Sequence, residues 1–554
     1  TGSTVTDTPT PYADGGNYCV LSPIDKDASI TVSDGNLKAT AATGVHNNAR
    51  STMGCGDSGL WYMEFTYTGA IGGSTAFAVG LYDPVFRIDN GTHPVSSGSG
   101  FYGLYASASS GMYTNGTTPS VTVSTGSAGD ILQLAYDVTS GKLWFGKNNV
   151  WYDSAGGTTG NPSTGANATI TTVATGRIFG YDIVSNTLTF NFGQRPFAYT
   201  PPAGFKTLHT GNLPDSAIEN GSEYFAATTY TGTGASLAVS NDVNGVSFQP
   251  DFVWAKDRTA AQQHMLFDSV RGVHNFLTSN TTSAEGTNTQ TLTGFNSNGF
   301  QLGTNGTINN TVANVAWNWK AGGAAVTNTA GSITSQVSAS PTAGFSVVTF
   351  TGNASGSATV GHGLGTAPSM VIVKRRDVAD GWPLYHSSLG VSKLLELHST
   401  SGEQTSSNYW GSAITSTTFG LSAGGSNNRS GSSNVAYCFS EVPGYSSFGS
   451  YVGNGSTDGP FVNLGLRPRW FLVKRTDVAA TWYIWNTSST PYNVADTALF
   501  PNLTNAESSN VAYYCDILSN GFKIRATNTD VNANGGTYIY MAFAENPFKN
   551  SLAR

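Results

Sequence analysis

Three lysines recur in the same local setting, which makes them the first candidates for chemistry. They are Lys256 in PDFVWAKDR, Lys374 in PSMVIVKRRD and Lys474 in PRWFLVKRTD, and the aspartates that follow them are Asp257, Asp377 and Asp477. A recurring lysine could hold a ligand carboxylate or a sugar hydroxyl. The alternative is a strand end with a surface Lys–Asp pair or a turn cap, worth at most about 1 kcal/mol. We favour this alternative, because repetition follows from a repeated fold alone.

Six aromatic residues in polar, loop-like surroundings are the candidates for ligand binding. They are Tyr113, Trp151, Tyr152, Trp382, Tyr409 and Trp410. An aromatic face can stack on a sugar ring while neighbouring Asn and Ser side chains bind its hydroxyls. The alternative, that each ring packs against its own domain, carries at least equal weight.

No pattern in the sequence indicates catalysis. The His residues are scattered and lack the spacing of metal ligands, and neither a GxSxG nucleophile elbow nor a P-loop occurs. We therefore expect no enzyme activity, no metal site and no cofactor. The cysteines are Cys19, Cys55, Cys438 and Cys515. A Cys19–Cys55 bridge remains an alternative, but four independent thiols are favoured because spacing alone cannot place two thiols within bonding distance.

The composition is polar with few charges. Charged residues make up 11% of the 554 residues and the formal net charge is −7, so no basic surface for nucleic acid is expected. No apolar run approaches the length of a membrane span. Abundant Gly, Ser, Thr and Asn favour short strands and turns over long helices. Residues 1–14 have the composition of a linker, and we expect that Thr1 is not the true start and that the chain belongs to a longer product.

The first third of the chain is a series of short strands. LWYMEFTY (60–67) and TAFAVGLYD (75–83) are apolar strands that end at turns, and DILQLAYDV–TSG–KLWFGKNNVWY (130–152) is a hairpin pattern. TLTFNFG (187–193) alternates with period two, so Leu188, Phe190 and Phe192 share one face. These patterns predict an antiparallel sandwich over residues 15–208.

The same motifs, in the same order, resemble a SPRY domain. GLWYMEF, AVGLYD, GDILQLAYDVTSGKLWFGKNNVWY and the closing TLTFNFGQRPFAYTPPAGFKTL carry this resemblance, and the ending is similar to the version found in bacteriophage tail and virion proteins. The resemblance implies a concanavalin-like jelly-roll sandwich. It also implies a non-catalytic binding module that holds its ligands in loops at one rim.

The closing stretch NFGQRPFAYTPPAGF (191–205) concentrates aromatic rings and prolines. A sugar platform is one interpretation, but closure of the sandwich is favoured. Proline cannot donate to a strand ladder, so this stretch should leave the last strand extended. Phe197, Tyr199 and Phe205 should then cover an exposed edge strand. Arg195 should pair with a carbonyl or a carboxylate.

The rest of the chain repeats three times. The lysine-bearing segments are followed in turn by SNGFQLG, STTFGLSA and SNGFKIRA and then by NVAWNW, NVAYCF and TYIYMAF. We infer β-rich repeat units at 219–322, 341–445 and 446–549, a linker at 323–340 and a tail at 550–554. Continuous apolar segments such as MVIV predict strands covered on both faces. Helical turns are expected near 261–270 and 392–399. The units resemble a tandem domain of undefined function in phage structural proteins.

The predicted fold class is therefore all-β, a SPRY-like sandwich followed by three β-rich repeat domains. The resemblances imply a non-enzymatic virion structural protein, a tail fibre or other appendage, that acts in assembly and host-surface binding. Its expected partners are other virion proteins, copies of itself (a trimer by analogy) and a host glycan or protein. A capsid decoration protein and a capsule polysaccharide depolymerase remain as alternatives.

Overall fold

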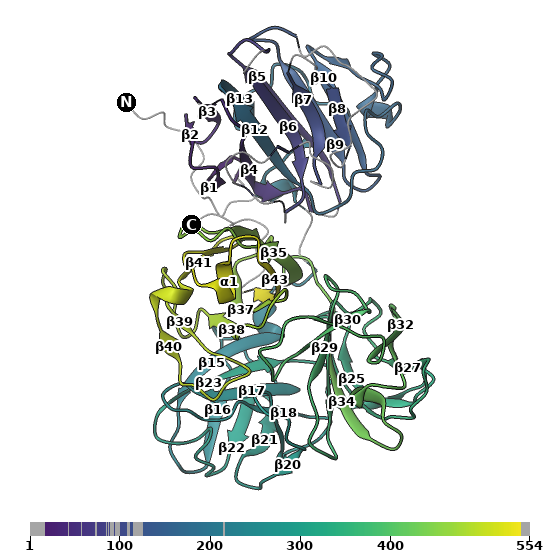
Figure 1. Cartoon of the computed structure of the whole chain (residues 1–554), viewed down its shortest axis with the longest axis vertical. Coiled ribbons are helices and arrows are strands. Elements are labelled where there is room, and N and C mark those ends of the chain that lie inside the picture. The colour runs from purple at the N-terminus through teal and green to yellow at the C-terminus, as the bar shows by residue number, and fades with distance from the viewer. Residues whose placement is uncertain are drawn as a thin grey trace.

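The regular secondary structure of the described residues is almost entirely β-strand, which confirms the predicted fold class. The computed structural model describes residues 17–544 except 43, 57, 73–74, 85, 87, 89–92, 95–99, 108–110, 115–125 and 214–216. The predicted tail at 550–554 and the linker at 1–14 lie outside these residues. Figure 1 shows a sandwich at one end of the molecule and a larger body of three units at the other. We call residues 17–213 the sandwich and residues 218–544 the three-unit body.

The sandwich consists of two sheets whose strands pair antiparallel, except that β14 pairs parallel to β5. In the described residues, the six-stranded sheet has the order β1 (Leu21–Lys26), β4 (Asn47–Gly54), β12 (Ile178–Val184), β6 (Ala76–Tyr82), β7 (Tyr102–Ala106) and β8 (Gly111–Thr114). The second sheet has the order β11 (Val150–Trp151), β10 (Lys142–Lys147), β9 (Leu132–Asp137), β5 (Leu60–Tyr67), β13 (Asn186–Asn191), β3 (Lys38–Ala41) and β2 (Ile30–Ser33), and β14 (Lys206–Thr207) pairs with β5. The apolar face of each sheet lies in a common core that includes Leu188, Phe190 and Phe192.

The stretch after β13 covers the sheet rather than its edge. Phe197 and Phe205 pack beside Tyr62 and Trp144 on the outer face of the second sheet. The carboxylate of Glu64 accepts hydrogen bonds from the backbone N–H groups of residues 198 and 199 at 2.8 and 2.9 Å. The prediction that this stretch closes the sandwich is thus confirmed. The prediction that it covers an edge strand is wrong, because it covers the outer face of the second sheet. The buried carboxylate of Glu64 on β5 holds residues 198 and 199 against the outer face of the second sheet, because it accepts hydrogen bonds from both.

Each unit of the body contains a main sheet and a small sheet. The main sheet of the first unit runs β15 (Phe225–Thr231), β23 (Ala313–Trp319), β17 (Phe252–Asp257), β18 (Met265–Asp268), β19 (Asn275–Thr278) and β20 (Gly286–Thr287). That of the second unit runs β24 (Val326–Asn328), β25 (Ser335–Ser340), β26 (Phe345–Thr351), β34 (Ser433–Phe439), β28 (Met370–Arg375), β29 (Pro383–His386), β30 (Lys393–Glu396) and β31 (Gln404–Thr405). That of the third unit runs β35 (Ser446–Val452), β43 (Thr537–Ala544), β37 (Pro468–Arg475) and β38 (Trp482–Asn486), with β39 (Thr497–Ala498) and β40 (Ser508–Ser509) paired beside it.

The small sheets have the same order in all three units. They are β16 (Leu237–Ser240), β22 (Gly299–Leu302) and β21 (Leu292–Asn296); β27 (Ala358–Gly361), β33 (Thr418–Leu421) and β32 (Trp410–Ile414); and β36 (Phe461–Asn463), β42 (Gly521–Ile524) and β41 (Cys515–Leu518). The described helical turns are η1 (Pro162–Thr164), η2 (Thr210–Asn212), η3 (Gly221–Glu223), η4 (Ser426–Asn428), η5 (Val511–Tyr513) and α1 (Thr529–Asn532). The register repeats as well, because Phe252 pairs with Trp319, Met370 with Phe439 and Trp470 with Phe543.

The main sheets are covered on both faces, as their apolar runs predict. One face of each main sheet packs against the small sheet of its own unit. The opposite faces of the three main sheets meet in one shared core, where the ring centres of Trp319 and Trp470 lie 5.6 Å apart and those of Phe439 and Phe543 lie 6.1 Å apart. The three units therefore form one body with a common centre.

Three local predictions need correction. The stretch 323–340, expected as a linker, contains β24 and β25, which extend the main sheet of the second unit. The helical turns expected near 261–270 and 392–399 are instead the short strands β18 and β30. Both are held by pairing with neighbouring strands, which outweighs local helix preference. The four cysteines are free and buried.

Candidate functional site

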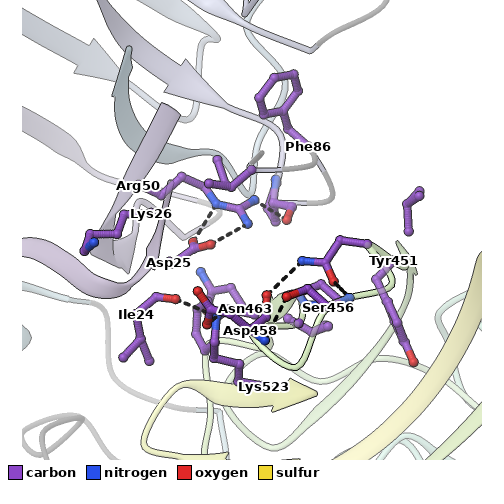
Figure 2. A pocket seen from close by; sticks show the side chains of 18 of the residues that line it. Ile24, Asp25, Lys26, Arg50, Phe86, Tyr451, Ser456, Asp458, Asn463 and Lys523 are labelled. Atoms are coloured by element: carbon purple, nitrogen blue, oxygen red, sulfur yellow. Dashed lines mark hydrogen bonds and ion pairs between the residues drawn. The ribbon is translucent and has the colours of Figure 1, made fainter. Parts of the chain in front are cut away.

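A pocket of about 300 Å³ lies where the sandwich meets the third unit (Figure 2). The sandwich contributes β1, the turn after it, Arg50, Pro84, Phe86 and Ile88, and the third unit contributes β35, the loop 454–460, β36 and part of β42. Volumes of this order are at the small end of ligand sites. The pocket is thus built from chain segments that are far apart in the sequence.

A buried ion pair forms the sandwich wall of the pocket. Arg50 on β4 donates from Nε and Nη2 to the two carboxylate oxygens of Asp25 at 2.7 and 3.1 Å, and both side chains are 3% exposed. The same guanidinium donates to the backbone oxygens of Asp83 and Pro84. Because a planar guanidinium has five donors in a fixed fork, it can bind β1 and residues 83–84 at once. Arg50 therefore positions both segments around the pocket.

Lys523 on β42 connects the two walls. Its Nζ donates to the backbone oxygen of Ile24 in the sandwich at 2.7 Å and lies 3.1 Å from Asp458 in the third unit. A second contact runs from Asn520 Nδ2 to the backbone oxygen of Thr52 at 2.7 Å. These bonds hold the sandwich against the third unit, although the apolar cores of the two parts are separate.

The pocket combines balanced charges with free polar groups. Its lining includes three carboxylates (Asp25, Asp27 and Asp458) and three cations (Lys26, Arg50 and Lys523). Within the described residues, no hydrogen bond engages Oδ2 of Asp27 or Nδ2 of Asn463, whose other polar atoms accept from Ser29 N and Gly465 N. Apolar residues, among them Ile24, Pro84 and Phe86, complete the lining. The arrangement can bind a small ligand that has both hydroxyl groups and apolar faces.

The aromatic candidates from the sequence do not line this pocket. Trp382 is fully buried, and its Nε1 donates to the backbone oxygen of Thr281 at 2.9 Å. Trp410 and Tyr152 are 2% and 8% exposed. For these three rings the alternative holds, since each packs against the protein, and flanking polar residues do not reveal which face a ring occupies. Trp151 on β11 and Tyr409 are half-buried. Tyr113 lies on β8, and its side chain is outside the described residues.

Trp410 contributes to a second, shallow depression. This depression has a volume of about 640 Å³ and is lined mainly by Ser, Thr and Asn side chains of residues 392 and 405–408. Trp410 pairs with Leu421 at a position where the first unit has Leu292 and the third has Cys515, all three buried. The indole is therefore a core residue at the floor of this depression.

The recurring lysines are buried and bind backbone oxygens. Lys374 Nζ donates to the oxygens of Thr282 and Asp380 at 3.0 and 2.8 Å, and Lys474 Nζ donates to those of Thr400 and Ala480 at 2.9 and 2.6 Å. Burial lowers the pKa of each of the three lysines to about 8. The predicted surface Lys–Asp pair is wrong.

The aspartates of the repeated pattern have other partners. Asp377 pairs with Arg375 at 2.8 Å, and Asp477 pairs with Arg475 at 2.8 Å. Asp257 is buried and caps the turn that follows it by accepting from the N–H groups of residues 259 and 260. The lysines and aspartates are thus structural, as the favoured interpretation held, but not as partners of each other.

One further titratable cluster lies in the sandwich. His46 Nδ1 and Asp182 Oδ2 are 2.7 Å apart, and the ring centres of His46 and His93 are 3.9 Å apart. Burial raises the pKa of Asp182 and, together with His46, lowers the pKa of His93 to about 4. Within the described ranges, no group of three or more His, Cys, Asp or Glu side chains is arranged to hold a metal ion.

No sequence signal pointed to the inter-domain pocket. Its walls come from PIDKDAS near the start of the chain and from YVGNGSTDGPFVN near its end, and neither stretch has a recognisable motif. A comparison of equivalent positions in the three units does distinguish two of the pocket residues. Lys523 takes the place of Gln301 and Gly420, and Asn463 takes the place of Ser240 and Gly361. The third unit therefore departs from the repeat at pocket positions.

Part of the chain is similar to solved structures, and one family model matches it. Part of the chain is similar to the SPRY domain of human HERC1, with 18% identity over 31% of this chain and 96% of that chain and a TM-score of 0.24. It is also similar to the PSpry domain of TRIM65, with 12% identity over 32% of this chain and 92% of that chain and a TM-score of 0.23. No curated protein matches the chain. No helix in the described residues has the length and apolar character needed to cross a bilayer.

The three-unit body matches one family model over nearly its whole length. The model is described as "Domain of unknown function (DUF7483)" and spans residues 220–547, which includes all three units. A single model that covers the three units accords with their shared core. The chain belongs to the DUF7483 family.

Proposed function

We propose that the protein is a non-enzymatic structural component of a virus particle, in a tail fibre or other appendage, and that it binds the host surface through the inter-domain pocket. The viral part of this proposal rests on the resemblance of the sequence to phage tail and virion proteins. The pocket carries the binding part, because it has free polar groups and lies between two parts that, among the described residues, are joined by few hydrogen bonds. Copies of itself and other virion proteins are the proposed assembly partners.

The binding role can be tested with particles assembled from a variant whose pocket is filled by a larger side chain. Ser450 lies on β35 and lines the pocket, so Ser450→Trp should occupy the cavity. We expect normal particle yield and at least tenfold slower adsorption to host cells. Thr229 is the equivalent residue of β15 by its pairing with β23, and Thr229→Trp is the matched control. Equal adsorption of both variants would contradict a receptor role for the pocket.

Two other measurements separate the alternatives. Electron microscopy of the particle should place the protein on the tail or another appendage. Density on the faces of the capsid would instead indicate a decoration protein. Incubation of purified protein with host capsule should release no oligosaccharides, and release would indicate a depolymerase.

A further inference from the structure

Two of the three carboxylates that line the inter-domain pocket are already paired with cations. Asp25 is paired with Arg50, and Asp458 lies within 3.1 Å of Lys523. Lys26 Nζ donates to the backbone oxygens of Asp27 and Ile30 at 3.3 and 2.8 Å. A charged ligand would have to compete with these partners and lose its own hydration, which is costly in a partly enclosed site. The lining therefore favours an uncharged ligand.

The remaining polar groups supply both hydrogen-bond types. The Asn463 amide offers N–H donors, Asp27 Oδ2 is an acceptor, and the Ser450 hydroxyl can act as either. Ile24, Phe86 and Pro84 add apolar surface to the lining. A sugar ring has this dual character, with hydroxyls at its rim and C–H groups on its faces. A peptide carboxylate or a phosphate does not.

From this geometry we propose that the pocket binds a terminal, uncharged sugar unit of a surface glycan, held between the sandwich and the third unit. This inference rests on the proposed host-binding function and names its ligand class. The Asn463 amide is the principal donor, and Lys523 holds the two walls at the distance that the ligand needs. Figure 2 shows Asn463 and Lys523 on the third-unit side, facing Ile24 and Asp25 of the sandwich.

The repeat offers a conservative test of the donor. Ser240 of the first unit occupies the position of Asn463, and its Oγ accepts from the N–H of residue 242 as Asn463 Oδ1 accepts from that of residue 465. Asn463→Ser should therefore keep the turn and remove only the amide. Ser240→Asn is the matched control, since it makes the reciprocal change far from the pocket.

The purified full-length chain should be applied to immobilised neutral oligosaccharides that end in hexose or N-acetylhexosamine, beside sialylated and uronate-bearing ones. We expect binding to neutral glycans, a loss of about tenfold or more in Asn463→Ser, equivalent to about 1.4 kcal/mol, and none in Ser240→Asn. Lack of neutral binding, preference for acidic glycans, or equal effects of the two variants would overturn the inference. Normal adsorption of particles carrying Asn463→Ser, with neutral binding confirmed in the purified protein, would instead contradict the proposed function.

Discussion

At the residue scale, two of the three recurring lysines, Lys374 and Lys474, join neighbouring units. Lys374 of the second unit donates to the Thr282 oxygen of the first, and Lys474 of the third donates to the Thr400 oxygen of the second. Each ammonium also lies over the ring of the tryptophan eight residues later, at 5.8 Å from Trp382 and 5.9 Å from Trp482. A buried cation with carbonyl and ring partners recovers part of its lost hydration. These lysines therefore stabilise the contacts between units.

Lys374→Met should lower the free energy of unfolding by about 1–3 kcal/mol, because two buried carbonyls lose their donor. The loss should grow with pH. Burial lowers the pKa of Lys374 from 10.5 to about 8, so between these values the unfolded chain binds more protons and wild-type stability rises with pH. The variant lacks this contribution. Denaturant unfolding near pH 7 and near pH 9.5 measures the difference in the free energy of unfolding between the wild type and the variant. Lys206→Met, at an exposed position, is the control. A difference in unfolding free energy that becomes smaller as the pH rises would contradict the lowered pKa of Lys374.

At the scale of elements, the strands were predictable where their sequence reports their surroundings. MVIV and its counterparts are apolar at every position because both faces of β28, β17 and β37 are covered. The alternation of β13 likewise predicted one buried face. The sequence did not reveal the burial of Lys374 or Trp382, because their partners come from another unit. The pocket was unpredictable for the same reason, since residues 24 and 523 meet only in the folded chain.

A buried asparagine in each unit fastens the turn that follows β15, β26 or β35. In the third unit, Asn532 Oδ1 accepts from Asn454 N at 2.8 Å, and its Nδ2 donates to the oxygens of Ser456 and Ala526 at 2.7 and 2.8 Å. Asn309 and Asn428 make the equivalent bonds to residues 233 and 353. The turn fastened by Asn532 opens into the loop 454–460, which lines the pocket.

Asn532→Ala should therefore affect stability and binding together. Loss of these bonds leaves buried backbone groups unpaired, and we expect the free energy of unfolding to fall by about 2 kcal/mol or more. Binding of the neutral glycan should weaken as the loop loosens. Denaturant titration and the glycan assay measure the two effects, with the exposed Asn505→Ala as the control. Unchanged stability would show that the asparagine is not a fastening residue.

At the scale of the whole molecule, the body closes on itself. The second unit binds the first through Lys374, and the third binds the second through Lys474. The first unit binds the third through Arg258 and Glu507, whose charged atoms lie 2.6 Å apart. Ser488 of the third unit also donates to the oxygen of Ala227. With the shared core at its centre, this ring of contacts makes the three units one structure. Figure 1 shows the three units grouped in one body below the sandwich.

A chain that ends at residue 445 should fail to form the body. Removal of the third unit uncovers Phe225, Trp319 and Phe439, which pack against Trp470 and Phe543. Burial of each large apolar side chain contributes about 1.5–3 kcal/mol, so losses at several of them approach the whole stability of a domain, about 5–15 kcal/mol. Residues 217–554 without the sandwich should instead unfold in one cooperative transition, since their core is separate from that of the sandwich. Calorimetry of both shortened chains measures how many cooperative unfolding transitions each one has. If residues 218–445 gave a cooperative transition within the chain 1–445, the units would fold independently.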